Sequence, residues 1–215
     1  MDQYYYLKPE PGIRGKYAYL CRLLIIALLS IMLGACATTA KHAGDSGSIL
    51  VGARDDIAID PGVARDFNTA LSLLKKEKYE QAIELLESIV KRENRVTAPY
   101  VNLGIAYMRV GEMGKAENNL KKAVELDPGH PIANNELGLL YRRTGRFSQA
   151  RNVYERTLKK YPDFLPVRKN LAILCDIYLD DLDCALNNFE KLAEALPEDQ
   201  QLKIWIAEVK NRKGR

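Results

Sequence analysis

Few side chains in this 215-residue sequence have the type and spacing that catalysis or metal binding requires. The two histidines stand in unlike contexts, His42 among small residues and His130 in a Pro-Gly-His-Pro turn, which argues against a histidine-based metal site. No Ser-His-Asp or Cys-His arrangement, H-E-x-x-H motif or glycine-rich phosphate loop is present. We therefore expect a protein that is not an enzyme, with no cofactor, metal or small-molecule substrate.

Three aspartates, Asp180, Asp181 and Asp183, form an acidic cluster that would suit calcium. A calcium-binding EF-hand loop also needs a glycine and a glutamate at fixed later positions. The residues that follow, Cys184-Ala185-Leu186, supply neither of them. We interpret the cluster as a solvated turn that starts a helix.

The overall composition is that of an ordinary globular protein. Hydrophobic residues make up 47% and charged residues 28% of the chain. Lys and Arg number 32 against 28 Asp and Glu, which gives a formal net charge of +4. This charge is too weak, over such a length, to predict a nucleic-acid partner.

The first 35 residues differ from the rest of the chain. Arg14, Lys16 and Arg22 precede an uncharged, mostly apolar run of thirteen residues, 23–35. A helix that crosses a bilayer needs about 20 apolar residues, whereas the apolar core of a signal peptide is shorter. The run is therefore typical of a signal peptide over residues 1–35.

The apolar run ends in Leu33-Gly34-Ala35-Cys36, which resembles a bacterial lipobox. The resemblance implies cleavage before Cys36, lipidation of that cysteine and anchoring by two or more acyl chains. It also implies a periplasm-facing lipoprotein, and Ala37 after the cysteine favours the outer over the inner membrane. The alternative is an uncleaved signal anchor over about residues 17–35. Residues 36–62, rich in small and polar side chains, are expected to form a flexible tether.

The remainder of the chain is internally repetitive. Leu103, Gly104 and Tyr107 recur 34 residues later as Leu137, Gly138 and Tyr141. Further positions recur in the same phase: Gly111 with Gly145, Ala116 with Ala150, and Pro128 with Pro162. Glycine and proline are typical of helix ends, and small residues allow close approach between neighbouring elements.

These positions resemble the tetratricopeptide repeat (TPR). The resemblance implies an all-α fold, a right-handed superhelix (α-solenoid) of about four helix pairs with a C-terminal capping helix. It places repeats within residues 63–200, at 63–96, 97–130, 131–164 and 165–199, the last with one extra residue in its turn. Residues 201–215 would form the capping helix and tail, with Leu202, Trp205, Ile206 and Val209 as its inward stripe.

Cys175 and Cys184 fall on the two helices of the fourth repeat, across its turn. An antiparallel hairpin can bring the two thiols together, and the periplasm is oxidising, which suggests a disulfide. Two reduced and buried thiols are the alternative. The spacing is not C-x-x-C, which argues against redox catalysis.

In the tetratricopeptide family, first-helix residues line a concave groove that binds extended or helical peptides. By position, the groove residues here are Asn68, Lys75, Asn102, Arg109, Asn135, Leu139, Arg142, Arg143, Lys169 and Asn170. Asparagines can bond a partner's backbone, and the basic side chains can hold carboxylates.

The resemblance implies a membrane-anchored scaffold or assembly factor of the bacterial cell envelope, in pilus or secretion, outer-membrane or TonB/ExbB-type complexes. Its partner would be an envelope protein or peptide in the groove, and its lipid anchor would bind the membrane. The alternative is a structural oligomerisation module whose repeats self-associate.

Overall fold

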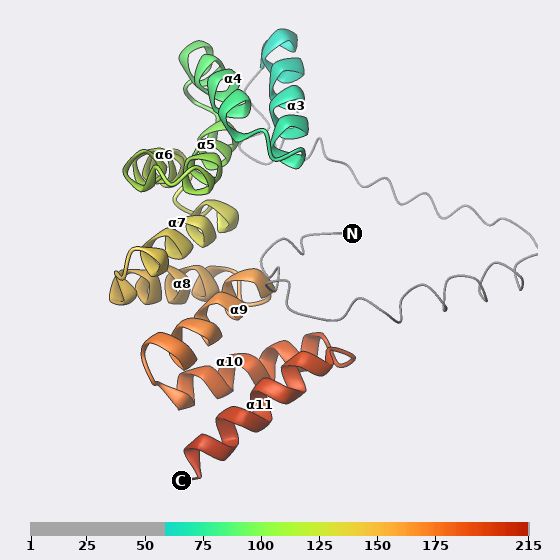
Figure 1. The fold of residues 1–215 in the computed structure, drawn as a ribbon, viewed down its shortest axis with the longest axis vertical. Helices are drawn as coiled ribbons and strands as arrows, with labels where there is room; N and C mark the ends of the chain where they lie inside the picture. The colour runs from blue at the N-terminus through green and yellow to red at the C-terminus, as the bar shows by residue number, and fades with distance from the viewer. Residues whose placement is uncertain (1–58, 215) are drawn as a thin grey trace, which may run out of the picture. The chain divides into compact units, whose positions relative to one another are not determined.

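The computed structural model describes residues 59–214, so the predictions for the signal peptide, for lipidated Cys36 and for most of the tether lie outside the described residues. Within residues 59–214 the fold is an α-solenoid, with nine α-helices, one π-helical segment and no strand (Figure 1). The helices are α3 (Pro61–Lys75), α4 (Tyr79–Arg92), α5 (Thr97–Arg109), α6 (Met113–Leu126), α7 (Pro131–Arg143), α8 (Phe147–Lys160), α9 (Leu165–Ile173), α10 (Leu182–Ala195) and α11 (Gln200–Lys213), with the π-helical segment η1 (Leu174–Tyr178) between α9 and α10. The predicted all-α fold class is confirmed.

The helices follow one another as antiparallel pairs, α3 with α4, α5 with α6, α7 with α8, and α9 with α10. Each second helix also packs on the first helix of the next pair, as α6 does on α7. In addition, α5 contacts α7 and α7 contacts α9, so the first helices form a continuous layer. Stacking is required because a single pair cannot bury its own apolar face.

Close approach within the pairs depends on small residues of the first helices. A Cβ atom on Gly104 would lie 2.4 Å from Leu120 Cγ, and one on Gly138 would lie 2.3 Å from Tyr154 Cε1. Glycine is therefore needed at both positions. In the fourth repeat Ala172 occupies the corresponding place and is fully buried.

Each of the four hairpin turns contains one residue with a positive φ. The values are 58° at Glu77, 86° at Gly111, 74° at Gly145 and 50° at Asp180. Glycine adopts this conformation readily, whereas other residues lose about 1–2 kcal/mol there. The first and fourth turns thus carry a local cost that the two middle turns avoid.

The extra residue of the fourth repeat is taken up between Cys175 and Asp181. In the third repeat, Arg146 N donates to Tyr141 O, five residues back, at 2.8 Å. The corresponding bond in the fourth repeat runs from Asp181 N to Cys175 O, six residues back, at 2.9 Å. The added residue widens the helix end into the π-helical segment η1.

The last helix, α11, packs on α10 with the inward stripe that its sequence predicts. Leu202 and Val209 are buried, and the Trp205 ring lies 5.4 Å from the Phe189 ring, centroid to centroid. Ile204, on the same helix, is exposed. None of the described helices is both long and apolar enough to cross a membrane.

Candidate functional site: the first-helix surface

The first helices of the second, third and fourth pairs are α5, α7 and α9, and we call the layer they form the first-helix surface. Their charged side chains are almost all of one sign. Their cationic side chains are Arg109, Arg142, Arg143, Arg168 and Lys169. Their single carboxylate, Glu136, is only 5% exposed. This surface therefore presents cations to solvent with no exposed carboxylate on the same helices.

The second helices carry both signs, and several of their charges are paired locally. Arg151 of α8 binds Glu155 at 2.7 Å and Asp181 at 2.8 Å. Glu117 of α6 binds Arg146 and Lys121, each at 2.8 Å. The hydrogen bond from Arg146 is the main reason that the pKa of Glu117 falls to about 2.

The residues predicted to line the groove differ in accessibility. The exposed ones are Asn68, Lys75, Arg109 and Arg143, and the half-buried ones are Asn102, Arg142, Lys169 and Asn170. Asn135 and Leu139 are buried, at 8% and 4% exposure, so their assignment to an open groove is wrong. Both lie on α7, which packs against α5, α6, α8 and α9.

The asparagine amides of the first helices form hydrogen bonds within and between these helices. Asn170 Nδ2 of α9 donates to Asn135 Oδ1 of α7 at 2.9 Å, and Asn135 Nδ2 donates to Glu136 Oε1 at 3.0 Å. Asn102 Nδ2 bonds Ala98 O of its own helix at 2.9 Å. The Asn170–Asn135 bond thus links α9 to α7, and the amide donors that form these bonds are used within the protein.

Two cations of the surface lie against aromatic rings. Lys169 Nζ is 5.4 Å from the centre of the Trp205 ring, and Arg142 Cζ is 5.9 Å from that of Tyr178. The Tyr178 ring in turn lies 4.9 Å from that of Phe147. Such contacts orient a cation without neutralising its charge.

Sequence reasoning missed two exposed apolar side chains that follow α9. Ile177 is 66% exposed and Tyr178 is 45% exposed, and both belong to η1. The available signal was the extra residue of the fourth repeat, since π-helical insertions are frequent at functional sites. Among the residues described, Arg142 Nη1 is also buried without a hydrogen-bond partner.

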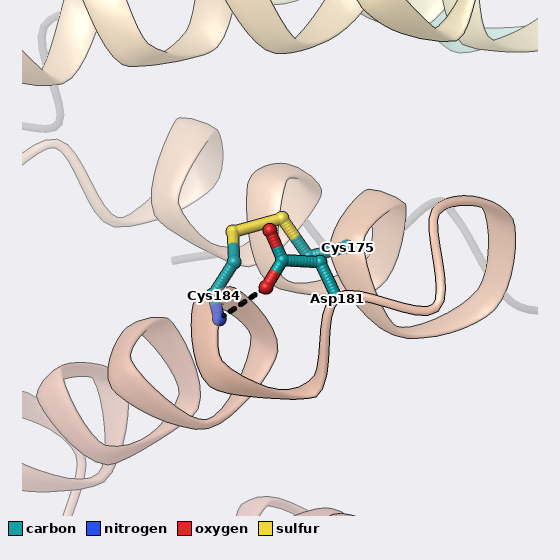
Figure 2. Close-up of side chains that lie close together, drawn as sticks. All are labelled: Cys175, Asp181 and Cys184. Carbon is teal, nitrogen blue, oxygen red and sulfur yellow. Dashed lines mark hydrogen bonds between the residues drawn. A yellow bond between two sulfur atoms is a disulfide. The ribbon is translucent and has the colours of Figure 1, made fainter.

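Cys175, Cys184 and Asp181 lie together at the turn of the fourth repeat (Figure 2). The two sulfur atoms are bonded to each other as a disulfide, with an S–S distance of 2.02 Å. The Asp181 carboxylate accepts a hydrogen bond from Cys184 N at 3.0 Å, which lowers its pKa, and it also pairs with Arg151. The cluster thus starts α10 and leaves no free set of ligands for a metal.

A hollow of about 610 Å³ lies on the second-helix side, between α8 and α10. Its lining includes cations such as Arg151 and Lys191 and carboxylates such as Glu155 and Asp183. Several of these charges are already paired, Arg151 with Glu155 and Asp183 with Lys213. The hollow therefore has no clear charge preference for a ligand.

Residues 66–93 and 95–163 each match a family model described as tetratricopeptide repeat. The protein therefore contains tetratricopeptide repeats, as its sequence predicts. This fold is typically non-catalytic and generally mediates protein–protein interaction or assembly.

Among curated proteins, the chain is 26% identical over 111 residues to the probable UDP-N-acetylglucosamine–peptide N-acetylglucosaminyltransferase SPINDLY of Solanum lycopersicum. That match covers 51% of this chain but 12% of the plant protein, and it includes only the repeat part. A Photosystem I assembly protein Ycf3 of Prochlorococcus marinus is 28% identical over 111 residues, which is 45% of this chain and 59% of Ycf3. The chain thus spans less than two thirds of the length of each of these relatives.

Solved structures share the fold. MamA from Desulfovibrio magneticus RS-1 aligns with a TM-score of 0.64 and 20% identity, over 73% of this chain and 88% of that one. A tetratricopeptide repeat protein from Parabacteroides merdae aligns with a TM-score of 0.61 and 21% identity, over 78% of this chain and 65% of that one. At such identities the likeness establishes the α-solenoid alone.

Proposed function

We propose that this protein is a non-catalytic scaffold that binds an envelope protein or peptide on its first-helix surface. The observation that carries the proposal is the run of cationic side chains on three neighbouring first helices whose one carboxylate, Glu136, is buried. Arg109, Arg143 and Lys169 stand on these helices, whereas the second helices carry carboxylates as well as cations, such as Glu155 on α8. A surface of one sign attracts and orients a partner of the opposite sign.

We further propose that the protein acts as a lipid-anchored assembly factor in the bacterial cell envelope, facing the periplasm and favouring the outer membrane. Support comes from the Leu33-Gly34-Ala35-Cys36 motif and the apolar run before it. One relative, Ycf3, is named as a Photosystem I assembly protein, which is consistent with an assembly role for this protein. Complexes of the pilus or secretion, outer-membrane or TonB/ExbB type are the proposed setting. A tether would raise the effective concentration of the surface near membrane partners.

Charge reversal on one layer at a time tests the binding proposal. The variant of the first-helix surface, which we call the groove variant, combines Arg109→Glu, Arg143→Glu and Lys169→Glu in the full chain. The matched control combines Arg156→Glu, Lys159→Glu and Lys191→Glu, which are exposed second-helix residues and change the net charge equally. Affinity capture from envelope extracts, read by mass spectrometry, should lose its specific partner with the groove variant only. Equal capture by both variants would overturn the proposal.

The anchor is tested separately with Cys36→Ser. Metabolic labelling with an alkyne fatty acid should mark the wild-type chain and not the variant, and the variant should leave the membrane fraction. Mass spectrometry of the mature N-terminus should begin at Cys36. An intact peptide bond between residues 35 and 36 would refute lipidation at this cysteine.

A further inference from the structure

The π-helical segment η1 places apolar side chains in solvent at the edge of the first-helix surface. Ile177 is 66% exposed, more than any other large hydrophobic side chain within residues 59–214. Counting back by the repeat period from Ile177 leads to Arg143 and then to Arg109. The fourth repeat therefore has an aliphatic side chain where the two repeats before it have arginine.

This segment is held in place on several sides. Cys175 is joined to Cys184 of α10, and Leu179 N donates to Leu174 O at 3.1 Å. Asp176 forms an ion pair with Arg212 of α11. An apolar group that is fixed before binding loses little conformational entropy when a partner covers it.

A cation, Arg142, lies against the ring of Tyr178. The Arg142 guanidinium is 5.9 Å from the centre of the Tyr178 ring, and its Nη1 is buried without a hydrogen-bond partner among the described residues. The acidic residues that flank Ile177 and Tyr178, Asp176 and Asp181, are each bound to another arginine. Because Nη1 is buried, a partner's carboxylate would pair with the solvent-facing part of the half-buried Arg142 side chain.

We infer that Ile177, Tyr178 and Arg142, which we call the fourth-repeat anchor, bind a partner segment in which a carboxylate stands next to an apolar side chain. The carboxylate would accept hydrogen bonds from Arg142, and the apolar side chain would cover Ile177 and the exposed part of Tyr178. This inference rests on the proposed function, because it names the partner chemistry of one end of the same surface. Interface energy concentrates at such fixed apolar and arginine groups.

The probe for this inference is a random dodecapeptide library displayed on phage and selected against the full chain. We expect the selected peptides to carry Asp or Glu next to Leu, Ile or Phe. Ile177→Ser and Arg142→Gln should each weaken binding of a selected synthetic peptide about tenfold in fluorescence polarisation. The matched controls are Leu196→Ser, another exposed apolar residue, and Arg156→Gln, an exposed cation of α8. Both controls should stay within about twofold of wild type. Circular dichroism of each variant checks that the fold is kept.

The outcomes separate this inference from the proposed function. If the selected peptides bind the anchor variants as tightly as wild type but lose binding to the groove variant, the anchor is wrong and the groove stands. If only one of the two anchor variants weakens binding, the paired chemistry is wrong. If no peptide is selected, the anchor fails as a site for short segments, and capture from envelope extracts still decides the proposed function.

Discussion

The third and fourth repeats build the same hairpin with different local chemistry. The third repeat uses Gly138 for close approach and Gly145 for its turn. The fourth uses Ala172 and Asp180 at these places, one extra residue in a π-helical segment, and a disulfide across the turn. Both versions build the same hairpin, so the hairpin itself does not explain why the fourth repeat differs from the third. The difference leaves an exposed apolar segment, η1, beside a cation.

The close contact in the third repeat explains why its glycine has no substitute. Tyr154 fills the space above Gly138, and its side chain is fully buried. The corresponding residue of the fourth repeat is Phe189, whose ring lies against Trp205 of α11. The last helix thus takes part in the packing of the fourth repeat, and the third repeat has no equivalent contact with a tryptophan.

Removing the disulfide of the fourth repeat should change the free energy of unfolding the most. Cys175 and Cys184 are nine residues apart, and the loss of so short a closed loop should lower the free energy of unfolding by roughly 2–3 kcal/mol in the chain-entropy account. The variant is Cys175→Ala with Cys184→Ser, measured by urea denaturation followed by circular dichroism. An unchanged unfolding midpoint would show that the turn is stable without its covalent link.

Giving the third repeat the small residue of the fourth should have the next largest effect. Gly138→Ala places a Cβ against the Tyr154 ring and should lower the free energy of unfolding by about 2 kcal/mol. Gly114→Ala in α6 is the matched control, since its Cβ meets nothing within 4 Å, and it should be neutral or stabilising. Thermal unfolding of both variants checks this. Equal melting temperatures would contradict the close-contact explanation.

Exchanging the turn residues should have a smaller effect of opposite sign in the two repeats. Gly145→Ala, at a φ of 74°, should lower the free energy of unfolding by about 1 kcal/mol. Asp180→Gly should raise it by less than about 1 kcal/mol, because aspartate tolerates this conformation better than most residues. Denaturant titration of the pair measures both changes. A loss of stability in Asp180→Gly would mean that the aspartate side chain contributes more than its backbone costs.

The smallest expected effect on stability concerns the N-terminal caps of α7 and α9, the helices that start the third and fourth repeats. His130 caps α7 by accepting a hydrogen bond from Ala133 N at 3.2 Å, whereas Phe164 at the start of α9 forms no side-chain cap. Burial lowers the pKa of His130 below 6.5, so the folded state favours the neutral ring. Its contribution to stability is therefore present above pH 6.5 and is lost as the pH falls below that value.

Melting temperatures between about pH 8 and about pH 5 measure this contribution. His130→Asn keeps a capping side chain that does not titrate, so its melting temperature should fall less on acidification than that of wild type. Parallel pH curves for the two proteins would rule out His130 as the titrating group.

Much of the fold was predictable because its signals are local. Gly104 and Gly138 were expected to allow close approach, and a Cβ on either would clash with the second helix of its pair. The groove was predicted less well. Position along a first helix does not reveal how deeply its neighbours cover it, and Asn135 and Leu139 are buried on α7, which packs against four other helices, α5, α6, α8 and α9.

The sequence by itself determined the period, the helix pairs and their ends, because glycine, proline and the small residues act within a single hairpin. Only the tertiary structure decided which polar and charged groups face outward. That choice depends on packing between successive pairs, which buries Asn135 and leaves Arg142 Nη1 without a partner among the described residues. The tertiary structure also decided where the extra residue of the fourth repeat is taken up, which is the π-helical segment η1 that carries the exposed Tyr178.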